Sequence, residues 1–217
     1  MTDSEKHQGL RNFLVRELAH KGIKDSKVLA AIAQVPRHLL LDSIFEAQAY
    51  KDIAFPIASG QTFSRPYTVA FQTELLEVEK DQKILEIGTG SGYQSAVIIA
   101  LGAYLYTIER QQELFKKTKI LLPKMGYSPT KMVFGDGYKG LPKDAPFDGI
   151  IVTAGVPNVP QALLFQLKIG GRMVIPIGEN VQVMTVFQRV SEKKFTKKEY
   201  GNFAFVPMLQ HVQTHIK

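Results

Sequence analysis

The sequence contains no cysteine. This absence excludes disulfide bonds, zinc sites built on thiolates and a cysteine nucleophile. Long apolar runs are also lacking, since no stretch approaches the ~20 residues that span a bilayer. Residues 1–6 lack the apolar core of a signal peptide. We therefore expect a cytoplasmic protein without a membrane partner.

Concentrated charge is missing too, although the formal net charge is +7. The densest basic run lies at the tip of a predicted β-hairpin: Lys193, Lys194, Lys197 and Lys198. A solvated turn explains this run better than a nucleic-acid patch does. The histidines show no metal-binding pattern, and the last two lie in a polar tail that we expect to be frayed: His7, His20, His38, His211 and His215. We therefore expect no bound metal.

The 217 residues suffice for one large domain or for a domain with an appendage. A hydrophobic content of 45% and a charged content of 22% are typical of a globular protein. The spacing of apolar residues along the sequence changes near residue 80. We expect a helical segment with a substrate loop over residues 1–80, packed on a core of residues 81–217 as one structural unit.

The N-terminal segment shows helical spacing. Apolar residues recur at this spacing over residues 5–20, which predicts an amphipathic helix. A second helix is expected after Ser26 and ends before Pro36, because the residue before a proline disfavours the helical region. Residues 53–66 have no helical period, and Pro66 suits the first turn of a further helix.

From residue 83 onwards, short apolar runs alternate with helical patterns. The predicted strands are 83–87, 104–108, 131–134, 148–153 and 172–177, and the predicted helices are 93–101, 111–124 and 160–167. Continuous apolar strands separated by helices indicate a parallel sheet covered on both faces. Residues 181–190 and 194–206 have no helix between them and predict an antiparallel edge hairpin. The fold class is therefore α/β, with a mostly parallel sheet.

A glycine-rich turn joins the first predicted core strand to its helix, in the sequence from Leu85 to Tyr93. Such turns bind nucleotides at the carboxyl edge of α/β sheets. Ser91 and Gln94 have the spacing of a capping box. A dinucleotide fingerprint requires a third glycine where this chain has Tyr93. The turn therefore suits S-adenosyl-L-methionine, which carries no phosphate.

Two acidic residues follow the next two strands. Glu109 lies about 20 residues beyond the glycine turn, where a carboxylate can accept hydrogen bonds from ribose hydroxyls. Asp136, followed by Gly137, can present a carboxylate to the adenine amino group. Alone, Glu109 is explained equally well as an exposed strand end, and Asp136 as a common turn. Their order at successive strand ends favours a cofactor site.

These segments resemble the successive motifs of the protein-L-isoaspartate O-methyltransferase family. The similar segments are 35–37, 60–67, 85–93, 108–110, 135–137, 146–154, 167–178 and 205–207. The Gly-Gln-Thr-x-Ser-x-Pro sequence of residues 60–66 is the most diagnostic of them. The resemblance implies a Rossmann-like fold of S-adenosylmethionine-dependent methyltransferases.

The resemblance also implies the reaction and its partners. A methyl group passes from S-adenosyl-L-methionine to the free α-carboxylate of an L-isoaspartyl residue in aged proteins and peptides, and S-adenosyl-L-homocysteine is the product. The ester then re-closes to a succinimide, some of which opens to normal aspartate. We expect a monomer whose partners are isoaspartyl proteins and peptides, without nucleic acid.

The same resemblance assigns residues to the site. Ser64 is the catalytic residue, and the substrate-binding residues are Gln61, Thr62, Ser64 and Val206. The cofactor-binding residues are Glu86, Gly88, Thr89, Gly90, Ser91, Glu109, Arg110, Asp136 and Gly137. A substrate carboxylate with a pKa of ~4 is ionised at neutral pH, so the reaction needs no general base. Ser64 then orients the carboxylate; the alternative is a helix cap before Pro66.

Some residues depart from the family pattern. Ala58 and Ser59 stand where a glycine and a polar residue are common, and Arg65 replaces a glutamine or alanine. Gly155 and Val156 replace a more alanine-rich stretch. All of these flank the expected substrate groove, and Arg65 adds attraction for an anionic peptide.

Two other functions remain open at the level of the sequence. A nucleic-acid methyltransferase would use the basic charge, but residues 153–157 lack the Asn/Asp-Pro-Pro-aromatic motif of amino-methylating enzymes. Methylation of cytosine C5 requires the missing cysteine. A non-catalytic module that only binds S-adenosyl-L-methionine has no need of the segment from Gln61 to Ser64.

Overall fold

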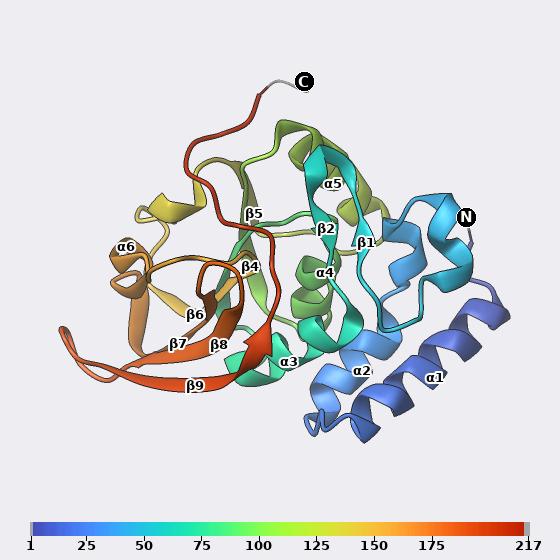
Figure 1. Ribbon diagram of the computed structural model, residues 1–217, viewed down its shortest axis with the longest axis horizontal. Coiled ribbons are helices and arrows are strands. Elements are labelled where there is room, and N and C mark those ends of the chain that lie inside the picture. The colour runs from blue at the N-terminus through green and yellow to red at the C-terminus, as the bar shows by residue number, and fades with distance from the viewer. Residues whose placement is uncertain (1, 215–217) are drawn as a thin grey trace.

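The computed structural model describes residues 2–214, and a seven-stranded sheet forms its centre (Figure 1). The strand order is β5-β4-β3-β6-β7-β8-β9. The strands are β3 Lys83–Ile87, β4 Tyr104–Glu109, β5 Lys131–Phe134, β6 Phe147–Val152, β7 Leu167–Ile177, β8 Gln182–Arg189 and β9 Phe195–Phe203. Neighbouring strands from β5 to β7 pair in parallel, whereas β8 and β9 pair antiparallel. The α/β, Rossmann-like fold class is confirmed.

Helices and short 3-10 turns surround this sheet. The helices are α1 Glu5–His20, α2 Ser26–Gln34, α3 Pro66–Leu76, α4 Tyr93–Ala100, α5 Gln112–Lys124 and α6 Gln161–Leu164. The 3-10 turns are η1 Arg37–Leu40, η2 Ser43–Gln48, η3 Ala58–Gly60 and η4 Gly137–Lys139, and a small hairpin pairs β1 Phe55–Pro56 with β2 Thr62–Phe63. Within residues 2–214, no helix has both the length and the apolar character to cross a membrane.

One predicted boundary is wrong. The helix expected over 160–167 is a single turn, and β7 begins at Leu167 rather than at 172. The first part of β7 pairs Leu167 with Phe147 and carries exposed residues at 168–170. An apolar-run search cannot detect such an exposed strand start.

The N-terminal helices share a buried core with α4. Leu14 and Leu18 of α1 are fully buried in the same cluster as Ile32 of α2 and Val97 of α4. In Figure 1, α1 and α2 lie next to α3 and α4 at one side of the sheet. This packing anchors the segment between α2 and α3, which carries β1 and β2, against the core.

Residues 204–213, here called the C-terminal strap, cross the carboxyl end of the sheet (red in Figure 1). The Met208 amide donates to the Gly155 carbonyl at 2.7 Å, and the Gln213 amide donates to the Arg110 carbonyl at 2.8 Å. The expectation of a frayed tail is therefore wrong as far as Gln213. Backbone pairing holds the strap, and a polar side-chain pattern gives no sign of it.

Candidate active site

The main cavity opens at the carboxyl ends of β3, β4 and β6. It is lined by Gln61, Thr62, Ser64, Val69, Gln72, Ile87, Gly88, Thr89, Gly90, Ser91, Tyr93, Gln94, Ile108, Glu109, Arg110, Gly137, Thr153, Ala154, Val206, Pro207, Met208 and Leu209. Because these strands are parallel, their following loops meet at one edge. Of the residues that the sequence assigned to the site, Glu86 and Asp136 do not line this cavity.

The glycine loop, residues 88–92, forms the floor of the main cavity. Its three glycines have positive φ angles of 95°, 53° and 86°, which other residues rarely adopt: Gly88, Gly90 and Gly92. A Cβ atom on Gly88 would lie 2.5 Å from the Thr153 hydroxyl oxygen. A side chain at position 88 would therefore displace Thr153, which also lines the main cavity.

The expected capping box is absent. Gly92 is the N-cap of α4, and no side chain caps this helix. Ser91 Oγ accepts a hydrogen bond from the Tyr93 amide at 3.3 Å, and Gln94 Nε2 donates to Thr73 Oγ1 at 2.8 Å. Gln94 thus bonds to Thr73 of α3 and does not reach back along its own helix.

Glu109 ties the glycine loop to the end of β4. One carboxylate oxygen accepts from the Gly90 amide and the other from the Gln111 amide, each at 2.8 Å. The side chain is almost fully buried, and this burial raises the pKa of Glu109, although the two backbone amides oppose the rise. A carboxylate has about four acceptor positions, so these backbone amides leave acceptor capacity for a ligand in the main cavity.

Glu86 lies beneath the cavity rather than in its wall. It is fully buried, and one of its oxygens accepts from the hydroxyls of Ser95 and Thr107. Burial raises the pKa of Glu86 to about 8, so the side chain is protonated at neutral pH. Thr107 in turn contacts the Thr89 hydroxyl at 2.6 Å. Glu86 thus supports a cavity residue from behind.

The two carboxylate oxygens of Asp136 each accept a hydrogen bond from a backbone amide. One carboxylate oxygen caps η4 by accepting from the Tyr138 amide at 2.9 Å, and the other accepts from the His211 amide of the C-terminal strap at 3.0 Å. The neighbouring Gly137 lines the cavity, and a Cβ atom there would lie 2.4 Å from Ile87. Gly137 therefore brings backbone without a side chain to the cavity, and Asp136 holds the C-terminal strap through His211.

Ser64 follows β2 and faces the glycine loop across the main cavity. Among residues 2–214, its hydroxyl makes no hydrogen bond. Arg65, not Ser64, is the N-cap of α3, and it makes no side-chain capping bond. The helix-cap alternative for Ser64 is therefore wrong, and the hydroxyl is free to contact a ligand.

Arg37 fixes the backbone of Ser64 from the buried side. Its side chain is fully buried, and it donates to the carbonyls of Ala49 at 2.6 Å and of Ser64 at 3.0 Å. Its guanidinium carbon lies 4.2 Å from the ring centre of Phe63 and 4.7 Å from that of Tyr93. Burial lowers the pKa of Arg37 to about 10, so the group stays charged at neutral pH. Although Arg37 belongs to a recognised motif, the sequence did not identify it as a support of the site.

Buried polar residues of the cavity wall were also missed. Gln72 of α3 is 1% exposed and donates to the Val152 carbonyl at 2.9 Å. Thr153 donates to the carbonyls of Ile87 and Gly88. A polar residue directly after an apolar strand was a usable signal for Thr153, whereas the position of Gln72 depends on the packing of α3.

A second hollow, here called the side groove, adjoins the main cavity. It shares Thr62, Ser64, Thr153 and Val206 with the main cavity. Its other walls are Lys21, Ala54, Arg65, Tyr67, Thr68, Phe71, Val181, Gly201, Asn202, Phe203, Ala204 and Phe205. Ser64 therefore stands where the two hollows meet.

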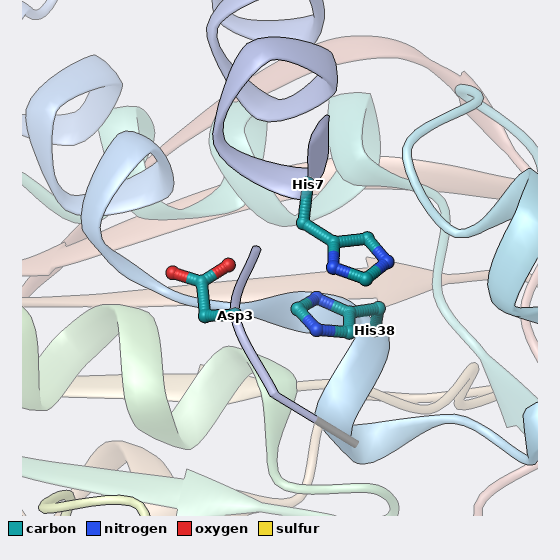
Figure 2. A group of neighbouring side chains, drawn as sticks. All are labelled: Asp3, His7 and His38. Atoms are coloured by element: carbon teal, nitrogen blue, oxygen red, sulfur yellow. The ribbon is translucent and has the colours of Figure 1, made fainter. Parts of the chain in front are cut away.

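Away from both hollows, the described residues include a group of side chains of metal-ligand type: Asp3, His7 and His38. Figure 2 shows the two imidazole rings lying face to face. Their centroids are 3.8 Å apart and their planes differ by 15°. Nitrogen lone pairs lie in the plane of each ring, so two stacked rings do not direct them to one ion. This arrangement does not suit a shared metal ion.

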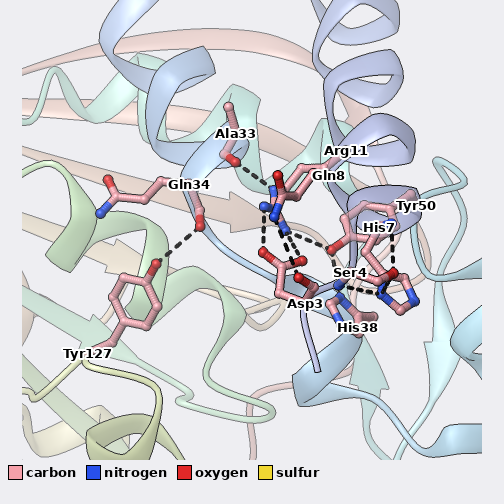
Figure 3. Close-up of polar contacts among 10 residues, drawn as sticks. All are labelled: Asp3, Ser4, His7, Gln8, Arg11, Ala33, Gln34, His38, Tyr50 and Tyr127. Carbon is pink, nitrogen blue, oxygen red and sulfur yellow. Dashed lines mark hydrogen bonds and ion pairs between the residues drawn. The ribbon is translucent and has the colours of Figure 1, made fainter. Parts of the chain in front are cut away.

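The contacts of this group instead join α1 to η1, which carries His38, and to Tyr50 (Figure 3). Both Asp3 oxygens accept from Arg11, at 3.0 and 2.9 Å, and these bonds lower the pKa of Asp3. The Tyr50 hydroxyl contacts Arg11 at 3.1 Å and His38 Nδ1 at 2.7 Å. The Arg11 guanidinium already pairs with the Asp3 carboxylate. We therefore interpret the group as a structural contact that holds α1 against η1. Sequence spacing gave no sign that His7 meets His38.

Comparison with known proteins identifies relatives of this arrangement. The profile of the Protein-L-isoaspartate(D-aspartate) O-methyltransferase (PCMT) family matches residues 9–213. The protein-L-isoaspartate O-methyltransferases of Flavobacterium psychrophilum and Flavobacterium johnsoniae are 62% and 63% identical to the chain over 210 residues. Each alignment covers 97% of this chain and 99% of the relative.

Solved structures have the same fold. A protein-L-isoaspartate O-methyltransferase superposes with a TM-score of 0.82 at 28% identity, over 91% of this chain and 65% of the other. A Plasmodium falciparum protein solved in complex with S-adenosyl-L-homocysteine superposes with a TM-score of 0.80 at 22% identity, over 92% of this chain and 98% of the other.

Proposed function

The chain belongs to the protein-L-isoaspartate(D-aspartate) O-methyltransferase family, and we propose how its site acts in that reaction. It is a methyltransferase that uses S-adenosyl-L-methionine to methylate isoaspartyl residues. The acceptor is the free α-carboxylate of the isoaspartyl residue in aged proteins and peptides. The observation that carries the assignment is the family match over residues 9–213, joined to a cavity in which the glycine loop faces Ser64.

The chemistry of the main cavity fits the cofactor. Arg110 is the one lysine or arginine in its described lining, and its Nε already donates to the His211 carbonyl at 2.9 Å. Such a lining suits a ligand without phosphate. Glu109 would hold the ribose hydroxyls with its remaining acceptor capacity. Backbone of the glycine loop and of Gly137 would border the amino acid and adenine ends.

Ser64 would donate its hydroxyl hydrogen to one oxygen of the substrate carboxylate. The cofactor supplies the methyl group on a sulfonium, which leaves as a neutral thioether. The carboxylate is ionised at neutral pH, so no residue has to remove a proton before attack. The protein therefore contributes orientation and the exclusion of water, and orientation alone supplies several kcal/mol. Gln61, Thr62 and Val206 would border the substrate.

A methyl-transfer assay with matched peptides tests the function. We expect the chain to methylate a peptide that contains one L-isoaspartyl residue and to leave its normal aspartyl twin unlabelled. Radioactive methyl incorporation measures both. Equal labelling of the two peptides, or labelling of RNA in their place, would contradict the proposal.

Loss of the Glu109 carboxylate should weaken binding of the cofactor. We expect Glu109→Ala to cost about 1–3 kcal/mol of binding free energy, since hydrogen bonds to a charged group have this strength. Asp136→Ala should also weaken binding, because it removes the carboxylate predicted for adenine and a bond to the strap. Calorimetry with S-adenosyl-L-homocysteine measures both affinities. Glu192→Ala, in the exposed β8–β9 turn, is the matched control; unchanged affinity in both site variants would reject this placement.

The division of the chain into segments, its oligomeric state, and its location and partners remain predictions. Residues 1–80 form a substrate-binding segment on a core of residues 81–217, and the core shared by α1, α2 and α4 supports a single structural unit. We propose that the chain acts as a monomer. The cytoplasm is the proposed location, and nucleic acid and membranes are not proposed partners.

A further inference from the structure

The side groove offers the path by which a peptide chain leaves Ser64. An isoaspartyl carboxylate bound at Ser64 must be joined to peptide on both sides, and the side groove opens beside this residue. Its wall is rich in aromatic rings: the Phe71 ring lies 5.7 Å from that of Tyr67 and 5.3 Å from that of Phe203. This inference rests on the proposed function, because it takes the side groove as the peptide site.

The charges on the side groove have one sign. Lys21 and Arg65 are the ionised side chains among its described lining residues, and no carboxylate lines it. Their side chains are 41% and 49% exposed. Both pair with the same oxygen of Asp52, at 2.9 Å from Lys21 and 2.8 Å from Arg65. The Asp52 side chain is only 3% exposed, so it lies beneath the two cations. The rim therefore carries two accessible positive charges over one buried negative charge.

Asp52 holds the two cations in place at every physiological pH. Burial opposes its ionisation, but hydrogen bonds from Arg65 and Lys21 and from the Tyr67 amide outweigh burial and lower the pKa of Asp52 to about 2. Its other oxygen accepts from the Tyr67 amide at 2.8 Å, which fastens the carboxylate to the first turn of α3. The positive rim is thus a fixed feature of the groove next to Ser64.

We propose that Arg65 and Lys21 make the enzyme prefer isoaspartyl peptides with an acidic side chain one or two residues from the isoaspartyl residue. A strand advances about 3.3 Å per residue, and Arg65 directly follows Ser64 and lines the side groove, so we expect its guanidinium to lie within reach of such neighbours. Exposed ion pairs are weak, and we expect a two- to fivefold gain in kcat/KM for each pair, on the order of measured surface pairs. Added salt should reduce the gain.

Two isoaspartyl peptides that differ only in a neighbouring Glu or Gln test this preference. The readout is the ratio of their kcat/KM values, which a general loss of activity does not change. We expect the wild-type enzyme to favour the Glu peptide, Arg65→Gln and Lys21→Gln each to lower the ratio, and the double variant to bring it close to one. Arg65→Lys should keep the preference because it keeps the charge. Lys193→Gln, the same charge change in the distant β8–β9 turn, should leave the ratio at the wild-type value.

The outcomes separate this inference from the proposed function. Methylation of both peptides with equal kcat/KM in the wild-type enzyme would overturn the inference and leave the function intact. A Glu preference that persists in the double variant would also overturn it. Failure to methylate either peptide would overturn the proposed function and the inference together.

Discussion

Replacement of Ser64 by alanine should lower the turnover of an isoaspartyl peptide by about 10²–10³, the usual cost of one preorganised donor to a charged oxygen. The hydroxyl has no hydrogen-bond partner among residues 2–214, so it is available to the substrate. The ionised carboxylate and the sulfonium both remain in the variant, which is why activity should fall without vanishing. Backbone amides of the loop that precedes Ser64 would moderate the loss if they also contact the carboxylate.

Turnover, melting temperature and affinity for S-adenosyl-L-homocysteine should be measured on the same Ser64→Ala sample. We expect affinity and melting temperature close to the wild-type values. Ser59→Ala is the matched control, because it removes a hydroxyl from the same loop outside the main cavity, where Ser59 donates to Glu113. A variant with full specific activity would show that Ser64 does not orient the substrate.

Replacement of Arg37 by methionine should destabilise the fold by about 2–4 kcal/mol and lower turnover as well. Methionine keeps an unbranched apolar stem but has no donors, so the carbonyls of Ala49, Ile53 and Ser64 would lose their partner. An unsatisfied buried group costs about 1–3 kcal/mol. Such a loss is a large share of the 5–15 kcal/mol by which domains are usually stable.

Urea denaturation gives the unfolding free energy of Arg37→Met, and turnover should be measured where the variant is fully folded. Arg37→Lys keeps the charge but lacks the fork of donors that reaches three carbonyls, so we expect an intermediate loss of stability. If Arg37 positions Ser64, folded Arg37→Met should show reduced kcat at saturating cofactor. Normal kcat in the folded variant would limit Arg37 to a structural role.

The sequence pointed to the candidate site because its signals lie at strand ends. The runs ending at Ile87 and Ile108 are mainly apolar, as expected for strands buried on both faces, and the residues after them are glycine and glutamate. Parallel pairing brings such ends to one edge, so Gly88, Glu109 and Gly137 could be placed together without knowledge of side-chain packing. The family motif added Ser64, whose loop has no periodic pattern of its own.

The direction of a side chain was less predictable than its place along the chain. Glu86 lies inside β3, where both faces are buried, and the sequence does not reveal which neighbours receive its carboxyl group. Asp136 has the expected position, but its oxygens bind the amides of Tyr138 and His211. His211 is distant in sequence, and its contact exists only because backbone bonds hold the C-terminal strap. Contacts of this kind depend on the folded chain as a whole.

The strap also has a kinetic consequence. Its residues from Val206 to Leu209 form one wall of the main cavity, and Arg110 and Asp136 fasten it through His211. Because two hydrogen bonds hold His211 against Arg110 and Asp136, we expect the strap to slow the passage of a nucleoside-sized molecule past this wall. We therefore expect a substitution that breaks the His211 contacts to speed both the binding and the release of the cofactor. The rate at which spent cofactor leaves then sets an upper limit on turnover.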